Sequence, residues 1–478
     1  MRLEVLRMER VRCLEQGVVL LDNFNLSILS GEIMGLLPLN NHGLTCLLRL
    51  LQRNSPLNFG YVYYKEEQIN TWRATKQRHN KIGLIQSESS LVDGLKVVDN
   101  LFLKSNLIKW IRRQRIFEIE VAPFLESLDI SICANGSVEG LTDFERIVVE
   151  VVKSVTAGHR LILLREISAN ISANDLIRIY RLLRYYSREG ISFLYIDFHL
   201  EELLRICDRV ALMSKGRIIK TITGKTQMPD SLFQYTQDLN NDTVTQIQQI
   251  SKKSKKSFLY EVKGINGAQI YDLSFSVVSG ECVILHHTDV KALNELLLIL
   301  SNKKQPNNAE MLIDGKRINY EMGGDVAVIQ ELPTKTMLFN ELSFVDNLCF
   351  LLDRRFPEIW YSNSLKDGIR EEYAKILGDV AFDSRINDLK EIQKYNLVYF
   401  RISLQMPKVV FCMQPFRQAD VELRKHIIEL MHMFLNQGIA LVILTVNVLD
   451  SLSIADKLIH IHTDKPAELF THEEFSSI

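Results

Sequence analysis

Residues 31–51, with the sequence GEIMGLLPLNNHGLTCLLRLL, have an order that could bind a phosphate group. They predict a buried strand, a tight polar turn and a helix, which is the frame of a phosphate-binding loop. Such a loop, G-x-x-x-x-G-K-S/T, needs glycines so that backbone N–H groups can wrap the phosphates, and a lysine to neutralise them. Here Pro38 stands at the first glycine, Gly43 is kept, Leu44 replaces the lysine and Thr45 keeps the hydroxyl that would face Mg²⁺. Most of the phosphate chemistry is therefore missing.

The polar turn of this loop keeps some capacity to bind anions. Its candidate residues are Asn40, Asn41, His42, Gly43 and Thr45. A helix N-terminus attracts anions through its backbone dipoles, so we expect weak phosphate or sulfate binding here at most. A threonine in the first turn of a helix also has ordinary structural roles, and we favour that interpretation for Thr45.

The composition excludes several classes of protein. The chain has 478 residues, which is too long for one core and fits two domains or more. It carries 57 basic and 58 acidic residues, so no overall field attracts nucleic acid or a membrane surface. The longest apolar runs are too short to span a bilayer, which predicts a soluble chain without direct membrane insertion.

The cysteines and histidines match no metal or disulfide motif. Seven cysteines are widely spread without a C-x-x-C pair, so neither a disulfide framework nor a zinc site is indicated, and a reducing cytoplasm is the natural location. Eleven histidines show no H-E-x-x-H or similar spacing. We therefore predict no metal site.

The chain repeats itself. The segment LSILSGEIMGLL around Gly31 returns as FSVVSGECVIL around Gly280, and VDNLFL around Asn100 returns as VDNLCF around Asn347. A third pair, ICDRVALM and IADKLIHI, follows in the same order near the end of each copy. The offsets of 249, 247 and 248 residues are nearly equal, which indicates a tandem duplication.

The repeat predicts the domain organisation. We expect a first domain over residues 1–237, a polar and lysine-rich linker over 238–256, and a second domain over 257–478. Within each copy, short apolar strands alternate with longer amphipathic segments. This alternation predicts α/β domains with largely parallel sheets covered by helices.

These segments resemble one known family almost throughout the chain, namely the double-cassette ATP-binding subunits of bacterial ABC importers for sugars such as ribose and galactose. SGEIMGLL, LVDGLKVVDNLFL, HRLILLREISANIS and EELLRICDRVALMSKGRII fall in the family's order, and SGECVIL and IADKLIHI do so in the second half. The resemblance implies two tandem P-loop-type ABC cassettes, each with an antiparallel β arm and a helical subdomain, paired as a pseudo-dimer within one chain. It also implies ATP and Mg²⁺, sandwiched between the phosphate loop of one cassette and the signature segment of the other.

The site built on the first phosphate loop departs from the family. Arg165 stands where the family has the aspartate coupled to Mg²⁺, although Glu166 remains at the position of the glutamate that polarises water. The family's signature serine and paired glycines correspond to Lys390, Glu391 and Ile392, and Glu391 would face phosphate. We interpret Glu166 as vestigial and expect it to form a surface ion pair with Arg165.

The other site departs further. Its loop has His287 at the first glycine and Leu293 at the basic position, and its strand ends in Met413 and Gln414 in place of aspartate and glutamate. In the same loop, Ala292 stands at the last glycine and Asn294 at the position of the hydroxyl residue. In the first half, Phe144 stands at a glycine of the signature segment and Ser87 at the glutamine of the lid-like loop. Phe198 stands at the position of the family's switch histidine, and His199 follows one residue later.

Magnitudes decide what these changes mean. A site that is half full at 1 mM ligand needs about 4 kcal/mol of binding free energy. Charge-assisted hydrogen bonds contribute about 1.5–3 kcal/mol each, so losing a lysine, a Mg²⁺ anchor and several glycines exceeds that margin. We expect ATP and Mg²⁺ to bind weakly at most and the chain not to be an efficient ATPase.

The segments kept in both copies suggest a binding role. The paired VDNL segments resemble the part of the family where the membrane permease docks, and the candidate docking residues are Leu91, Leu95, Asn100, Leu342 and Asn347. These residues could instead hold the helical subdomain together. Two functions stay open. The chain is a degenerate transport subunit held at the inner face of the membrane by a permease, or it is a soluble regulatory pseudoenzyme that binds another protein.

Overall fold

The computed structural model describes residues 3–15, 17–73, 79–103, 107–223, 258–301, 304, 309–317, 324–352, 368–373, 382 and 384–477. The chain divides into two compact units, Met1–Phe233 with Asp420–Glu422, and Gln234–Ala419 with Leu423–Ile478. The expected linker, residues 238–256, and the expected domain ends beside it lie outside the described residues, so those boundaries stay predictions.

The first unit begins with an antiparallel arm and continues into alternating strands and helices. Its strands are β1 (Glu4–Glu15), β2 (Val18–Leu29), β3 (Ile33–Pro38), β4 (Phe59–Tyr64), β5 (Glu67–Asn70), β6 (Ile82–Gln86), β7 (Leu161–Arg165), β8 (Ser192–Ile196), β9 (Arg209–Ser214) and β10 (Arg217–Thr223). Its helices are α1 (Leu44–Gln52), α2 (Val97–Phe102), α3 (Leu107–Ile111), α4 (Arg113–Ile116), α5 (Ala122–Glu126), α6 (Asp143–Thr156), α7 (Ala173–Arg188) and α8 (Leu200–Ile206), with short turns η1 (Phe117–Val121), η2 (Val138–Gly140) and η3 (Ile167–Asn170).

The second unit repeats this order. Its strands are β11 (Phe258–Ile265), β12 (Leu273–Val278), β13 (Cys282–His286), β14 (Glu310–Ile313), β15 (Lys316–Arg317), β16 (Val326–Ile329), β17 (Val409–Met413), β18 (Ala440–Thr445), β19 (Lys457–His460) and β20 (Glu468–Thr471). Its helices are α10 (Val290–Leu300), α11 (Pro333–Thr336), α12 (Phe344–Leu348), α15 (Glu391–Gln405) and α16 (Val421–Asn436), with turns η6 (Ile386–Asp388) and η7 (His472–Ser477). No helix among the described residues is both long enough and apolar enough for a membrane span.

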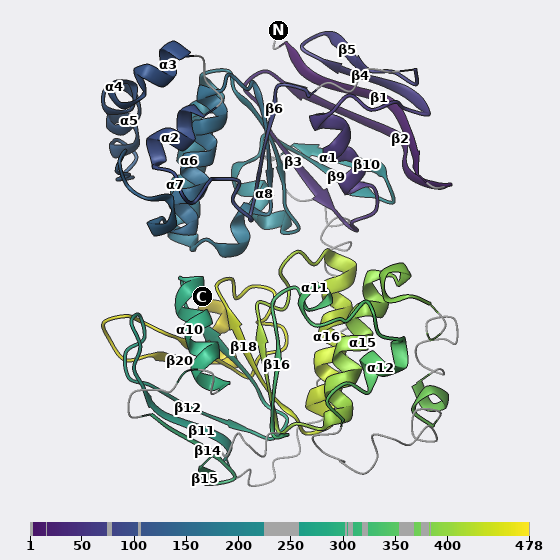
Figure 1. The fold of residues 1–478 in the computed structure, drawn as a ribbon, viewed down its shortest axis with the longest axis vertical. Coiled ribbons are helices and arrows are strands. Elements are labelled where there is room, and N and C mark those ends of the chain that lie inside the picture. Colours follow the sequence, from purple (N-terminus) through teal and green to yellow (C-terminus); the bar gives the residue numbers. More distant parts are fainter. Residues whose placement is uncertain are drawn as a thin grey trace. The chain divides into compact units, whose positions relative to one another are not determined.

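The two units share one sheet topology. The six-stranded sheets have the orders β6-β7-β8-β3-β9-β10 and β16-β17-β18-β13-β19-β20, which match strand for strand. All neighbours are parallel except the last pair of each sheet. Four-stranded antiparallel arms, β2-β1-β4-β5 and β12-β11-β14-β15, accompany them. In each unit of Figure 1, the arm and the larger group of helices lie on opposite sides of the central sheet. These features confirm the predicted fold of two tandem cassettes.

The central strands are buried on both faces. In β3, Ile33 and Leu37 belong to the core beneath the helices α2 to α8. Met34 and Leu36, which alternate with them, belong to the core that the arm and α1 enclose. Parallel strands covered on both faces read as continuous apolar runs, which is why the sequence predicts them well.

A buried glutamate joins strand ends in the first unit. Glu32 is 2% exposed and accepts a hydrogen bond from the N–H of Leu29 at 2.7 Å. Its carboxylate also accepts two hydrogen bonds from Arg209, from Nε at 2.6 Å and from Nη2 at 3.0 Å. The glutamate of the SGE segment therefore ties the start of β3 to β9.

The second unit repeats this contact with a lysine. Glu281 accepts a hydrogen bond from the N–H of Val278 at 2.8 Å and pairs with Lys457 Nζ at 2.8 Å. The repeated SGE letters thus serve the fold, because they close the same corner of each sheet.

The repeated aspartates also serve the fold. Asp208 accepts a hydrogen bond from the N–H of Ile33 at 3.0 Å, and Asp456 accepts one from the N–H of Cys282 at 2.8 Å. Each aspartate satisfies the first backbone donor of a central strand, which would otherwise be unpaired.

We predict that Glu32→Gln lowers stability by about 2–3 kcal/mol, because it discharges the partner of a bidentate arginine. This corresponds to a melting temperature of the first unit lower by about 5–10 °C. Glu281→Gln should cost less, since Lys457 makes a single contact. Glu9→Gln, a change on an arm side chain that is 44% exposed, serves as the control in calorimetric melting. Equal, small shifts for all three variants would contradict this account.

Candidate functional site

The polar turn after β3 is bonded into its own unit. Asn40 accepts a hydrogen bond from the N–H of Lys215 at 3.1 Å, and its Nδ2 lies 3.4 Å from Ser214 Oγ. His42 Nε2 lies 2.8 Å from the carbonyl oxygen of Val19. The side chains predicted to attract an anion therefore hold the loop against β2 and the turn between β9 and β10.

Gly43 is required by the backbone. Its φ is +81°, and a Cβ placed there would lie 2.2 Å from the carbonyl oxygen of Leu20. The glycine lets β2 approach the first turn of α1 closely. Its presence is explained without a phosphate.

The residues at the basic and hydroxyl positions differ in exposure. Leu44 is 1% exposed and packs in the core between α1 and the arm. Thr45 and Asn41 are exposed. The helix α1 begins at Gly43 without a side-chain cap.

The second loop is also organised around its own residues. The carboxylate of Asp289 accepts a hydrogen bond from the N–H of Lys291 at 2.7 Å and caps α10. His287 is buried and accepts a hydrogen bond from the N–H of Asp289 at 2.9 Å through Nδ1. Leu293, at the basic position, is fully buried, and Asn294 is exposed. Burial lowers the pKa of His287, which favours its neutral form.

The one retained acidic residue of the first site is bound to its neighbour. Arg165 Nε donates to Glu166 Oε1 at 2.9 Å, which confirms the predicted ion pair. The sequence predicts a surface ion pair, and this part of the prediction is wrong. The Glu166 side chain is only 6% exposed. The strand β7 lies between the parallel strands β6 and β8, and the carboxylate that follows it is buried. Glu166 also has a left-handed φ of 52°, which fixes its backbone in a strained turn.

The second unit keeps this turn without the carboxylate. Gln414 has a φ of 41°, and its N–H donates to the carbonyl oxygen of Leu444 at 2.8 Å. Glu166 donates in the same way to Ile196 at 2.9 Å. Gln414 Nε2 is buried without a hydrogen-bond partner among the described residues. The two positions therefore share their backbone geometry, but the first unit has a carboxylate there and the second unit has an amide.

A buried polar network at the end of β8 was not predicted. Asp197 is 1% exposed and accepts hydrogen bonds from Ser168 Oγ at 2.6 Å and from the N–H of His199 at 3.0 Å. His199 Nδ1 lies 2.9 Å from the same carboxylate. Burial opposes ionisation of Asp197, but the hydrogen bonds from His199 and Ser168 outweigh it and lower its pKa. Phe198, at the switch position, is buried instead.

The signature segments are closed helix N-termini. Thr142 and Glu145 form a capping box on α6, with Thr142 Oγ1 accepting from the N–H of Glu145 at 3.2 Å. Phe144 is buried in the helical core, with the Arg178 guanidinium 4.6 Å above its ring. In the second unit, Glu391 accepts a hydrogen bond from Thr334 Oγ1 at 2.6 Å. At the start of α6, a backbone donor is therefore used by a side chain of the same helix terminus, whereas Glu391 is held by a side chain of α11.

The repeated asparagines clamp a loop in each unit. Asn100 Oδ1 accepts from the N–H of Val92 at 2.9 Å, and its Nδ2 donates to the carbonyl oxygen of Val92 at 3.0 Å. Asn347 repeats both bonds with Phe339 at 2.9 and 2.8 Å and adds bonds to Leu342 and Ser343. Both asparagines are fully buried.

The candidate docking residues differ in exposure, and their docking role stays a prediction. Leu91, Asn100 and Asn347 have buried side chains, which support the loops. Leu95 is half-buried and Leu342 is 37% exposed, so only these two candidates reach the surface.

The clamped loops present apolar side chains that the sequence analysis missed. Val92 is 45% exposed and Phe339 is 40% exposed, at equivalent places in the two units. The signal that could have identified them is their fixed distance of eight residues before each repeated asparagine.

A histidine cluster near the second loop was also missed. The rings of His286 and His460 have centroids 4.6 Å apart, and those of His460 and His462 stack at 4.4 Å. Burial is the main cause that lowers the pKa of His286 to about 4, and the charge of the neighbouring His460 lowers it further. The H-x-H spacing of His460 and His462 was the available signal, because alternate residues of a strand share a face.

The chain is similar in sequence to known ATP-binding proteins of ABC transporters. The family model described as ABC transporter matches residues 21–169. The ribose import ATP-binding protein RbsA of Clostridium tetani is 21% identical over 95% of this chain and 92% of that protein. The xylose import ATP-binding protein XylG of Geobacillus kaustophilus is 22% identical over 95% of this chain and 94% of that protein.

Solved structures agree on the fold. The RNase-L inhibitor is similar with a TM-score of 0.59 and 14% identity, over 97% of this chain and 90% of that one. A structure titled as ribosome-bound archaeal Pelota and ABCE1 is similar with a TM-score of 0.62 and 12% identity, over 98% of this chain and 79% of that one. At these identities the likeness shows the fold alone.

Proposed function

We propose that this chain, which is similar to ATP-binding proteins of sugar importers over about 95% of its length, is a sugar-importer-type ABC subunit that has lost efficient ATP hydrolysis and acts by docking to a membrane permease. It would then work at the inner face of the cell membrane, held there through the permease. ATP and Mg²⁺ would bind weakly at most and would not drive turnover.

The proposal rests above all on the two leucines at the lysine positions. Leu44 is 1% exposed and Leu293 is fully buried, each within the core between helix and arm. A phosphate-binding lysine must place its ammonium at the mouth of the loop, and neither loop has one. Each missing charge-assisted contact removes about 1.5–3 kcal/mol of nucleotide binding.

The carboxylate positions support the same conclusion. A general base needs an oxygen free to accept a proton from water. In the first unit Glu166 is enclosed and paired with Arg165, whose charge would also repel Mg²⁺. In the second unit Gln414 offers an amide, which cannot accept a proton at neutral pH.

The clamped loops support the docking role. A buried asparagine with three or more hydrogen bonds holds each loop firmly, and each loop presents an exposed apolar side chain, Val92 or Phe339. A rigid loop that exposes apolar groups loses little entropy on binding, which favours a specific partner. Helices of a permease that face the cytoplasm would offer such a surface. A soluble regulatory protein is the alternative partner.

We predict no Mg²⁺-dependent ATPase activity for the purified chain, because both sites lack the lysine and a free acid. Phosphate release should equal that of a sample without protein. Glu166→Gln and the exposed control Glu189→Gln should leave this background unchanged. Turnover that disappears with Glu166→Gln but persists with Glu189→Gln would show a working carboxylate and overturn the proposal.

We predict that Phe339→Asp and Leu342→Asp each abolish partner binding without changing the melting temperature. A central interface residue contributes more than about 1 kcal/mol, and a charge in an apolar contact costs more. The measurement is crosslinking in native cells, followed by identification of the captured protein. Leu469→Asp, at an exposed leucine on β20, is the control and should not affect capture.

Asn347→Ala separates docking from stability in this experiment. It leaves buried backbone groups unsatisfied, so it should lower the melting temperature as well as capture. Capture of an integral membrane protein by the wild type, lost in Phe339→Asp, supports the permease. Capture of a soluble protein instead supports the regulatory alternative, and capture unaffected by both aspartate variants rules out this surface.

A further inference from the structure

Three side chains meet across neighbouring strands at one edge of the second sheet. In the register of this sheet, His286 of β13 lies beside His460 of β19, and His460 lies beside Glu468 of β20. Cross-strand partners have their Cβ atoms about 4.5–5.5 Å apart, so these side chains form a row. The row begins at the strand that leads into the second loop.

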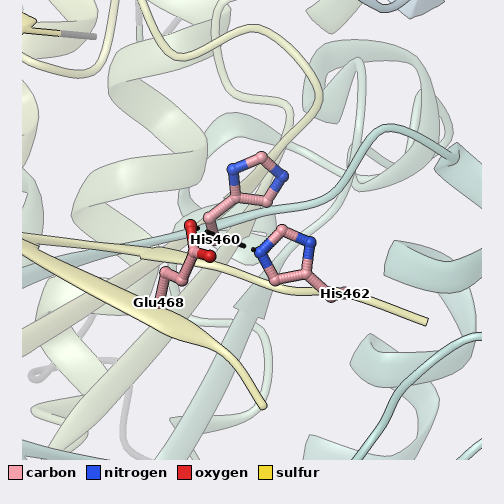
Figure 2. Close-up of side chains that lie close together, drawn as sticks. All are labelled: His460, His462 and Glu468. Carbon is pink, nitrogen blue, oxygen red and sulfur yellow. Dashed lines mark ion pairs between the residues drawn. The ribbon is translucent and has the colours of Figure 1, made fainter. Parts of the chain in front are cut away.

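His462 joins the row from the residues that follow β19. Ile461 is buried and its N–H donates to the carbonyl oxygen of His286 at 2.8 Å, so the chain stays extended past His460. His460 and His462 therefore lie on the same face, with stacked rings. Figure 2 shows both rings beside the carboxylate of Glu468, with the ion pair between His462 and Glu468 dashed.

We propose that His460, His462 and Glu468 form a binding site for a divalent transition metal ion, with Zn²⁺ as its ligand. One potential donor atom of each residue lies within 4.8 Å of the others. Donors around a tetrahedral zinc ion are about 3.4 Å apart, as bond lengths of about 2.0–2.2 Å require. The side chains would therefore have to rotate so that their donor atoms come closer together around the ion.

The two imidazoles and the carboxylate favour zinc over Mg²⁺ and Ca²⁺. Two imidazoles and one carboxylate are a common zinc set that leaves a fourth position for water. Mg²⁺ and Ca²⁺ prefer oxygen ligands in larger number, so this set disfavours them. The proposal is independent of the proposed loss of ATP hydrolysis and goes beyond it.

An unsatisfied atom points to the same ligand. His462 Nε2 is buried and makes no hydrogen bond of normal length among the described residues, because its ion pair with Glu468 Oε2 is long, at 3.5 Å. Native proteins rarely leave such an atom unpaired, because the lost hydrogen bond costs free energy. A metal ion between His462 and Glu468 would satisfy both.

The surrounding charges leave the site available. Lys465 Nζ pairs with Glu468 Oε1 at 2.5 Å, which leaves Oε2 to face the histidines. Lys465 is 52% exposed and can turn into solvent when a cation binds. His286 is not a ligand in this proposal, because its Nε2 lies 3.0 Å from the carbonyl oxygen of Val446. The ring of His286 would instead pack against the ring of His460.

Titration calorimetry of the whole chain with ZnCl₂ in a non-coordinating buffer tests the proposal. We expect one zinc ion per chain and a higher melting temperature, because the ion ties β19 to the edge strand β20. His462→Ala and Glu468→Gln should each weaken binding by at least about tenfold, whereas His472→Ala, which removes an exposed histidine just after β20, should not. Co²⁺ added to the wild type should give the visible spectrum of tetrahedral nitrogen and oxygen coordination.

Lys465→Ala keeps the experiment decisive if a ligand variant folds poorly. It removes the competing ammonium and should strengthen zinc binding by about threefold or more. Weaker binding in Lys465→Ala would overturn the proposal. The proposal also fails if the wild type binds no zinc, or if the loss of affinity is the same for His472→Ala and His462→Ala.

Discussion

The rest of the structure depends on the burial of the central strands on both faces. Because β3 and β13 carry apolar side chains on both sides, each sheet must be covered on the side of its arm as well as beneath its helices. The helices α1 and α10 supply this cover, and the position of a phosphate-binding lysine falls at the start of α1 and three residues into α10. Leu44 and Leu293 extend the apolar cover into the first helical turn. The contact that completes each core therefore also leaves each loop without a lysine, which links the stability of the fold to the proposed loss of ATP hydrolysis.

Two kinds of repeated residue are distinguished by what they contact. Glu32 and Glu281 close the same corner of each sheet, and Asn100 and Asn347 clamp the same loop, so residues that maintain backbone geometry are equivalent in both units. Residues at the expected nucleotide-contacting positions belong instead to the core or to an ion pair, as Leu44 and Leu293 are buried and Glu166 pairs with Arg165. A scaffold that maintains two loops while its catalytic positions become structural fits a protein that acts by binding. The proposed zinc site at the edge of the second sheet would add metal binding to that role.

The fold was largely predictable from the sequence, whereas the site was predictable only in part. Strands buried on both faces give apolar runs, and their repeated order predicted two matching sheets. The pairing of Arg165 with Glu166 was also predictable, since the residues are adjacent, but the burial of Glu166 depends on neighbouring strands. The side chain of Asn100 is buried because the loop that contains Val92 folds back against it. The meeting of His286, His460 and Glu468 depends on register between strands up to 182 residues apart, which no local pattern carries.

Calorimetric titration of the whole chain with Mg-ATP measures the central claim most directly, because it reports binding whether or not turnover occurs. Half-occupancy at 1 mM requires about 4 kcal/mol, which loops without a lysine or a free acid do not supply. The account predicts no saturable heat up to about 1 mM, both for the wild type and for Leu44→Lys, in which Arg165 still opposes Mg²⁺. A dissociation constant in the micromolar range for the wild type would show that the loops still bind nucleotide, and would contradict the account.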